Sequence, residues 1–140
     1  MKKLIALLFL AVNIGFAQQA ETFTKKLETA KAENKNVLLY FSGSDWCAPC
    51  IKFKKFIVNT PEFQTFATEN LVLYNADFPR QSKNKLAKEI EKENELLADK
   101  YNSKGVFPLI LLLDAEGNII KKWEELPKET VEEFIGKLKK

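Results

Sequence analysis

The chain has 140 residues, of which 46% are hydrophobic and 29% are charged, and its 22 basic residues exceed its 19 acidic residues by three. Two of the basic residues lie in the N-terminal segment, so the remainder carries 20 basic against 19 acidic residues. Binding to nucleic acid or to an anionic membrane usually requires a clustered basic face, and a nearly neutral chain gives no support for either partner. The length suits one domain that buries its core without metals or several disulfides.

The N-terminal segment has the layout of a secretory signal peptide. A basic start is followed by an apolar run, Leu4–Val12, and then by small residues at Gly15 and Ala17. The apolar run is too short for a comfortable membrane span, so an uncleaved N-terminal anchor is the weaker alternative. We therefore predict that residues 1–17 are a signal peptide and that residues 18–140 form one exported domain, periplasmic or secreted, without stable membrane insertion.

The rest of the chain alternates between helical and strand patterns. Helices are predicted where apolar residues recur every three or four positions, and strands where a short apolar run is bounded by polar or glycine residues. The predicted inner faces include Phe53, Phe56 and Ile57 on the helix after the cysteines, and Leu86, Ile90, Leu97 and Tyr101 on a highly charged, otherwise solvated helix. In chain order the predicted elements are helix 22–34, strand Val37–Phe41, helix Ala48–Val58, a helix that begins at Thr60–Pro61, strand Leu71–Tyr74, helix Lys83–Tyr101, strand Leu109–Leu113, strand Ile119–Trp123 and a helix that ends near Leu138.

Local signals support several of these boundaries. Thr60 precedes a proline as an N-cap would, and Thr130 with Glu133 has the spacing of a capping box. The segment Asp114–Asn118, which contains Gly117, indicates the turn of a hairpin. The order αβααβαββα, with helices between the first strands and a hairpin near the end, predicts an α/β sandwich around a mixed sheet.

Both cysteines, Cys47 and Cys50, lie in the segment SGSDWCAPC, between a predicted strand and a predicted helix. A disulfide that closes so short a loop contributes only about 2 kcal/mol by the loop-length relation, and a domain of this size does not need it. Two thiolates are half of a structural zinc site, and the chain has no histidine to complete one. Without the signal peptide no methionine remains either, so a two-thiolate Cu(I) carrier is a minor alternative. We expect neither a metal nor another cofactor.

A reactive dithiol explains the position of the pair better. Cys47 would sit at the start of a helix, where free backbone N–H groups and the positive end of the helix dipole favour the thiolate over the thiol. Cys50, one turn further along, would lie on the same side and could attack a mixed disulfide formed by Cys47. Pro49 would restrain the backbone between them. These residues therefore predict thiol-disulfide exchange, with Cys47 as nucleophile and Cys50 as resolving thiol.

Two segments together resemble a known family. The stretch VLLYFSGSDWCAPC, followed about sixty residues later by GVFPLILLLDAEGNII, is similar to the thioredoxin superfamily, in particular to exported bacterial thioredoxin-like proteins. The resemblance extends from Val37 to Leu138. It implies a thioredoxin-like three-layer α/β sandwich, with a central mixed sheet of four or five strands between helices. It also implies that Cys47 attacks, that Cys50 resolves, that Trp46 flanks the site and that Pro108 is a cis-proline facing the cysteines.

The resemblance also implies which residues contact substrate. A proline that opens a strand is usually only a strand boundary, and composition alone gives Pro108 no role in chemistry. In the family, however, the bend at this proline holds the preceding backbone, here that of Phe107, ready to pair with an extended substrate peptide. We therefore expect Trp46, Ala48 and Pro49 on one side of the substrate, and Phe107 and Pro108 on the other.

The sequence departs from the family pattern in four places. Tyr40 occupies the position where thioredoxins usually have a buried aspartate that helps deprotonate the resolving cysteine, so the proton must leave through water or through the nearby Asp45. The spacer SGSD is one residue longer than usual, which weakens any role inferred for Asp45 from the family. Phe107 replaces a common threonine and makes the substrate contact more apolar. The charged segment 77–94 is longer than in a minimal thioredoxin.

The sequence thus predicts a thiol-disulfide oxidoreductase that acts on protein disulfides. The Ala–Pro pair between the cysteines resembles thioredoxin-like reductases more than strong oxidants, and a reductase outside the cytoplasm would be recharged by a membrane thiol transporter. A non-catalytic thioredoxin-like binding module, with a permanently closed structural disulfide, is the alternative from a different class. The Cu(I) carrier is less favoured than either.

Overall fold

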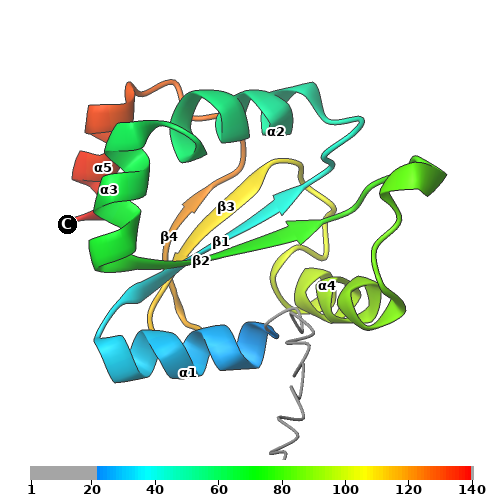
Figure 1. Ribbon diagram of the computed structural model, residues 1–140, viewed down its shortest axis with the longest axis horizontal. Helices are drawn as coiled ribbons and strands as arrows, with labels where there is room; N and C mark the ends of the chain where they lie inside the picture. Colours follow the sequence, from blue (N-terminus) through cyan, green and yellow to red (C-terminus); the bar gives the residue numbers. More distant parts are fainter. Residues whose placement is uncertain (1–21, 140) are drawn as a thin grey trace, which may run out of the picture.

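The computed structural model describes residues 22–139, which fold around one four-stranded mixed sheet (Figure 1). The strand order is β2-β1-β3-β4; β1 runs parallel to β2 and antiparallel to β3, and β3 and β4 form a hairpin. The predicted mixed sheet is confirmed, with four strands. The predicted signal peptide, residues 1–17, lies outside the described residues. The strands are β1 (Asn36–Ser42), β2 (Leu71–Asp77), β3 (Leu109–Leu113) and β4 (Ile119–Trp123).

Helices cover both faces of the sheet and complete the three layers. In Figure 1, α2, α3 and α5 lie on one side of the sheet, and α1 and α4 lie on the other. None of the helices formed by the described residues is both long and apolar enough to cross a membrane. The helices are α1 (Phe23–Glu33), α2 (Ala48–Phe53) with its π-helical continuation η1 (Lys54–Val58), α3 (Pro61–Asn70), the short 3₁₀ turn η2 (Ser82–Asn84), α4 (Lys88–Tyr101) and α5 (Val131–Leu138).

The core consists of two layers separated by the sheet. Alternate residues of β1 point to opposite sides: Leu38 and Tyr40 pack under α2, α3 and α5, whereas Val37, Leu39 and Phe41 pack under α1 and α4. Every residue of β3 is buried. The continuous apolar runs in the sequence are therefore explained by central strands that are covered on both faces.

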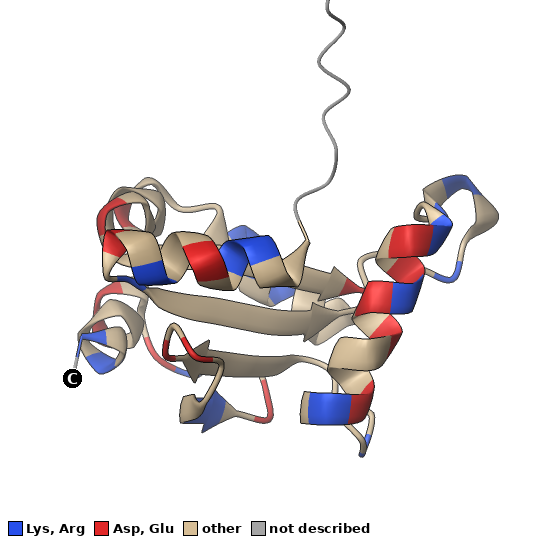
Figure 2. Cartoon of the chain, turned by 90° about the horizontal axis from the view of Figure 1, so that it is seen from below, with Lys and Arg blue, Asp and Glu red and all other residues tan. Residues whose placement is uncertain are grey.

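The predicted starts of α3 and α5 are confirmed by their caps. The Thr60 hydroxyl accepts a hydrogen bond from the Phe63 N–H at the start of α3. Thr130 and Glu133 form the reciprocal capping box at the start of α5, each side chain accepting a backbone N–H of the other residue. Basic and acidic residues are interspersed along α1 and α4, which agrees with a solvated outer surface (Figure 2).

The helix that follows the cysteines differs from the prediction in one respect. Phe56 is 57% exposed rather than part of the inner face. The reason is the π-helical segment η1, in which the Asn59 N–H donates to the carbonyl five residues earlier. This longer repeat places residues four and five apart on one face, so Phe53, Ile57 and Val58 are buried together and Phe56 turns outward.

The charged helix α4 begins later than predicted. It starts at Lys88 instead of Lys83, and Leu86 therefore lies outside it. The inner face of α4 also contains Asn94, which is only 1% exposed. Its side chain accepts a hydrogen bond from the Tyr74 hydroxyl and donates one to the backbone carbonyl of Asp77, so α4 is fixed to β2 by polar contacts as well as by packing.

Candidate active site

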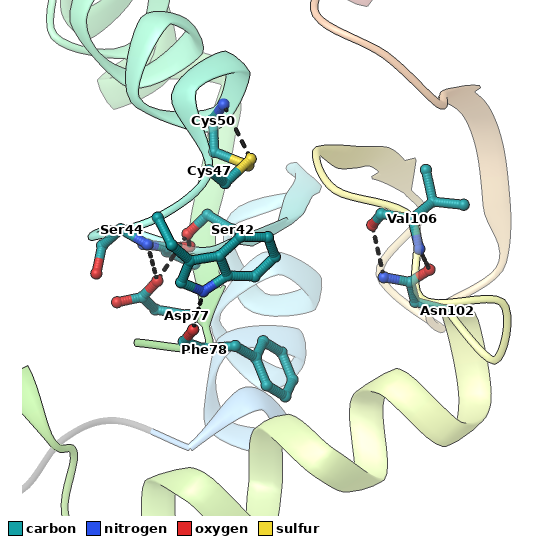
Figure 3. Close-up of a disulfide and its surroundings, with 10 residues drawn as sticks. Ser42, Ser44, Cys47, Cys50, Asp77, Phe78, Asn102 and Val106 are labelled. Atoms are coloured by element: carbon teal, nitrogen blue, oxygen red, sulfur yellow. Dashed lines mark hydrogen bonds between the residues drawn. A yellow bond between two sulfur atoms is a disulfide. The ribbon is translucent and has the colours of Figure 1, made fainter. Parts of the chain in front are cut away.

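The two cysteines lie where β1 leads into α2, as the sequence predicts (Figure 3). Cys47 is the N-cap of α2, and its Sγ accepts a hydrogen bond of 3.3 Å from the Cys50 N–H. The two residues form a disulfide with an S–S distance of 2.01 Å and a Cα–Cα distance of 5.2 Å. An N-cap sulfur that accepts a backbone N–H is placed where negative charge is stabilised.

In the disulfide, both cysteines are nearly covered, with exposed fractions of 4% for Cys47 and 3% for Cys50. Total burial thus does not separate the two. Cys50 lines a pocket whose wall also includes the exposed residues Ile51, Lys54 and Asn59, and Ala48 and Pro49 next to Cys47 are exposed at the surface. A substrate can therefore approach from the Cys47 side.

The loop before β3 faces this turn. The Phe107–Pro108 peptide bond is cis, in agreement with the resemblance to thioredoxins. The loop is shaped by Asn102, a buried residue at the end of α4, which donates to the Val106 carbonyl and accepts from the Val106 N–H at 2.9 and 2.8 Å (Figure 3). Sequence reasoning missed Asn102, although an asparagine at a helix end shortly before a glycine is a recognisable turn signal.

A groove runs between the active-site turn and this loop. It brings together Ala48 and Pro49 with Phe107 and Pro108, and residues 124–128 add charges of both signs. Trp46 lies next to the groove, since its ring meets Phe107 edge-on at a centroid distance of 5.2 Å. The groove is lined by Ala48, Pro49 and Lys52 on one side, by Phe107 and Pro108 on the other, and by Glu124, Glu125, Leu126, Pro127 and Lys128.

Trp46 is held from several directions. Its indole N–H donates to the Phe78 carbonyl at 2.7 Å, and the Arg80 guanidinium stacks 3.9 Å from the ring centroid. Phe107 meets both Trp46 and Phe78. The backbone of Gly43 lies against the ring, because a Cβ added there would overlap the indole. Sequence reasoning missed Gly43, which lies in the segment SGSDWCAPC, and Phe78 and Arg80, which lie far outside it.

The comparisons with known proteins agree with this architecture. A model of the thioredoxin-like domain matches residues 23–139, nearly the whole of the described chain. The chain belongs to this thioredoxin-like family.

Two curated relatives are similar to this chain, and one of them is named as a reductase. The chain is 38% identical over 99 residues to the disulfide bond reductase DsbH of Chlamydia pneumoniae, a match that covers 71% of this chain and 58% of the relative. It is 25% identical over 130 residues to the thioredoxin-related protein DsbJ of the same organism, covering 85% of this chain and 37% of the relative. The chain therefore spans less than two thirds of the length of either curated relative.

A solved structure of a DsbH oxidoreductase superposes with a TM-score of 0.76 at 32% identity, covering 85% of this chain and 80% of that one. A disulphide isomerase from Xylella fastidiosa Temecula1 superposes with a TM-score of 0.62 at 16% identity, covering 93% of this chain and all of that one, and shares the fold alone.

Asp45 is bound to a loop on the outer side of the thioredoxin-like active site. Its carboxylate accepts hydrogen bonds from the N–H groups of Arg80 and Gln81 and from the Asn84 side chain, at 2.9 to 3.0 Å. The Arg80 N–H, followed by the Asn84 amide, holds the pKa of Asp45 below its usual range. A carboxylate kept in its charged form by these donors is a weak proton acceptor. Its placement therefore favours a role in holding the 80–84 loop against the active-site turn.

Tyr40 lies on the inner side, where the family usually has an aspartate. Its ring packs edge-on against Phe53, with centroids 5.6 Å apart. Burial, and after it the charge of Asp77, raises the pKa of Tyr40 to about 12, so the hydroxyl is neutral at physiological pH. Tyr40 and Cys50 share a cavity of about 190 Å³, which we call the Cys50 cavity. It is lined by Tyr40, Ser42, Ser44, Cys50, Ile51, Lys54, Lys55, Asn59 and Asn75.

Proposed function

We propose that this protein is an exported thiol-disulfide oxidoreductase that reduces disulfides in protein substrates through Cys47 and Cys50. The observation that carries the proposal is the position of the pair: a dithiol at the start of a helix, beside a groove formed by the loop of Pro108. The similarity to a relative named disulfide bond reductase supports the reducing direction.

The reaction begins at Cys47. Its thiolate attacks one sulfur of a substrate disulfide, which forms a mixed disulfide and releases the other substrate sulfur as a thiolate. The helix start stabilises the Cys47 thiolate before the attack, because the first N–H groups of α2 have no partners within the helix. Cys50 then attacks the Cys47 Sγ, which closes the Cys47–Cys50 disulfide and frees the substrate with both sulfurs reduced.

The substrate is held as an extended peptide next to Cys47. The backbone of Phe107 and Pro108 offers hydrogen-bonding groups to such a peptide, as an open strand edge does. Ala48 and Pro49 form the opposite side of the site, and Trp46 contacts Phe107 beside it. Aromatic side chains dominate this rim, so an apolar residue beside the substrate cysteine would bind most favourably.

The predicted signal peptide places this reaction in the periplasm or outside the cell. Each turnover leaves the protein oxidised, so a second redox protein must return two electrons to Cys47 and Cys50. A membrane thiol transporter is the partner we propose for this step. Neither a metal nor an organic cofactor enters the chemistry, because sulfur alone carries the electrons.

Trapping the mixed disulfide tests the function and identifies the substrates. A Cys50→Ser variant, expressed with its own leader, should accumulate as adducts that a reductant releases, because serine cannot displace the substrate sulfur. Cys47→Ser, the matched control, should form few adducts. The reduced wild-type protein should also precipitate insulin by cleaving its interchain disulfides.

Two results would favour the alternatives. A folded, exported Cys50→Ser variant without adducts, together with a wild-type disulfide that resists mild reduction, would indicate a binding module with a structural disulfide. Stoichiometric Cu(I) binding by the reduced protein, without insulin reduction, would indicate a metal carrier.

A further inference from the structure

The Cys50 cavity offers a route by which the resolving cysteine can lose its proton. It has a volume of about 190 Å³, which is room for several water molecules. Its lining includes the polar residues Tyr40, Ser42 and Asn75 as well as Cys50, although most of the lining surface is apolar. Water in such a space has hydrogen-bonding partners and can pass a proton along them.

The parallel register of β1 and β2 brings the polar residues together. Tyr40 lies opposite Asn75, and Ser42 lies opposite Asp77. Because side chains alternate along a strand, these four residues face the same side of the sheet, beneath α2. The preceding positions on this face are apolar, as at Leu38. The apolar core thus ends and a polar cluster begins next to Cys50.

Hydrogen bonds link the cavity to Asp77. The Ser42 hydroxyl, which lines the cavity, is 2.7 Å from Asn75 Oδ1 and 3.1 Å from Asp77 Oδ1, and its single proton can be donated to either. The same Asp77 oxygen accepts the Ser44 N–H at 2.9 Å. Figure 3 shows Ser42, Ser44 and Asp77 together below the disulfide. Asn94 of α4 binds the Asp77 backbone carbonyl and fixes the end of β2.

We propose that Cys50 transfers its proton through water in the Cys50 cavity and the Ser42 hydroxyl to the Asp77 carboxylate. The step rests on the thiol-disulfide exchange proposed above. The Cys50 thiol gives its proton to a cavity water, the water gives one to Ser42 Oγ, and the Ser42 proton moves to Asp77. The Cys50 thiolate attacks Cys47 Sγ, so the Cys47–Cys50 bond forms, the bond to the substrate breaks, and the substrate leaves as a thiolate. Asp77, which is half-buried, then releases the proton to solvent.

The other groups that face Cys50 are poorer proton acceptors. Tyr40, from β1, is neutral, and its phenol would have to become a doubly protonated cation to keep the proton. Lys54 and Lys55, from η1, are ammonium groups with no free lone pair. Cys47 is occupied by the substrate at this stage. Asp77 is therefore the final proton acceptor in the resolving step. It does not touch Cys50 and acts on it only through Ser42 and water.

The two sulfur-transfer steps can be separated with a chromogenic aromatic disulfide as substrate. Attack by Cys47 on this probe releases one coloured thiolate in a second-order phase, and attack by Cys50 releases the second in a first-order phase. Stopped-flow measurements between about pH 5 and pH 9, the range in which thiols of this class titrate, give both rates. Asp77→Asn removes the acceptor with little change in shape, and Ser42→Ala removes the link but no charge.

Both variants should slow the second phase roughly tenfold or more near neutral pH and move its midpoint to higher pH, since an intramolecular proton acceptor is lost. The first phase should not change. Simple electrostatics predicts the opposite sign for Asp77→Asn, because loss of a negative charge would lower the pKa of Cys50 and speed the second phase. Asp114→Asn, in the hairpin turn between β3 and β4, is the control and should leave both phases unchanged.

The outcomes distinguish this route from the proposed function. Equal second phases in the wild type and both variants would overturn the proton route and leave the oxidoreductase function standing. A slower second phase in Asp77→Asn but not in Ser42→Ala would overturn the link through Ser42. A wild-type protein without a first phase would refute the proposed function, and the route with it. Denaturant unfolding of each variant shows whether a slow phase reflects a folded protein.

Discussion

Gly43→Ala tests the close contact that holds Trp46 beside the active site. A Cβ at position 43 would lie 2.5 Å from the indole Nε1 and 2.6 Å from Cζ2, and distances under 3.0 Å are essentially never seen for real Cβ atoms. The ring must therefore be compressed or rotate away. Compression of a packed site typically costs about 1–3 kcal/mol.

Rotation of the ring would lower the free energy of unfolding by a similar amount, because Trp46 would lose a hydrogen bond and an aromatic contact. Its hydrogen bond to the Phe78 carbonyl, 2.7 Å long, contributes about 1 kcal/mol, and its edge-on contact with Phe107 contributes about 0.5–1.5 kcal/mol. Either response predicts a loss of about 2 kcal/mol, which is roughly a thirtyfold change in the folding equilibrium. The substrate site should weaken as well, since Trp46 forms part of its rim.

Urea unfolding of the oxidised protein, followed by circular dichroism, measures this loss without depending on Trp46 fluorescence. Gly136→Ala is the matched control, because a Cβ at this position in α5 meets no atom within 4 Å. Alanine there should raise stability by about 0.4–1 kcal/mol. If Gly136→Ala behaves in this way and Gly43→Ala is as stable as the wild type, the contact with Trp46 does not constrain the turn and the argument is wrong.

Three further predictions follow from the site. Iodoacetamide labelling of the reduced protein against pH should give Cys47 a pKa well below the free-thiol value of about 8.5 and Cys50 a higher one, and equal reactivities near the free value would contradict the role of the helix start. Asn102→Ala should lower stability by about 2 kcal/mol and weaken insulin reduction, because it leaves the Val106 N–H and carbonyl without their partners; unchanged urea midpoints would show that the loop holds its shape alone. The pKa of Asp45 is lower in the folded state, so the stabilisation by its carboxylate is present above the unfolded pKa and is lost as the pH falls through the folded pKa. Asp45→Asn should therefore be less stable than the wild type at about pH 7 and approach the wild type at about pH 3. A difference in urea midpoint between the two proteins that is the same at both pH values would refute this.

The elements that the sequence predicted correctly are those fixed by burial on two faces or by local capping. The run Val37–Phe41 has no polar residue because both sides of β1 are covered, and Thr130 with Glu133 binds only its own helix start. The π-helical turn was not predictable in this way. The spacing of Phe53, Phe56 and Ile57 fits an ordinary helix equally well, and the choice depends on how η1 packs on the sheet.

The site was predictable where its residues are neighbours in sequence and unpredictable where it depends on distant pairing. The spacing of Cys47 and Cys50, together with their place between a predicted strand and a predicted helix, is enough to predict a reactive pair. The partners of Asp45, however, are backbone N–H groups 35 and 36 residues away, which have no sequence signature. The contact between Ser42 and Asp77 likewise depends on the register of two parallel strands, which no local pattern specifies.

Tyr40 and Asp77 together suggest why this chain can dispense with an aspartate in β1. A carboxylate at position 40 would have to be charged inside the cluster that contains Phe53 and Phe134, where an ion is strongly disfavoured unless it is paired. Tyrosine fills that space with a ring and stays neutral at its raised pKa of about 12. The acid lies instead at the end of β2, where Ser42 and the Ser44 N–H bind it and solvent reaches it. Packing beneath α2 and proton acceptance from Cys50 are thereby assigned to different residues, so a substitution at Asp77 can change the resolving step without opening the core.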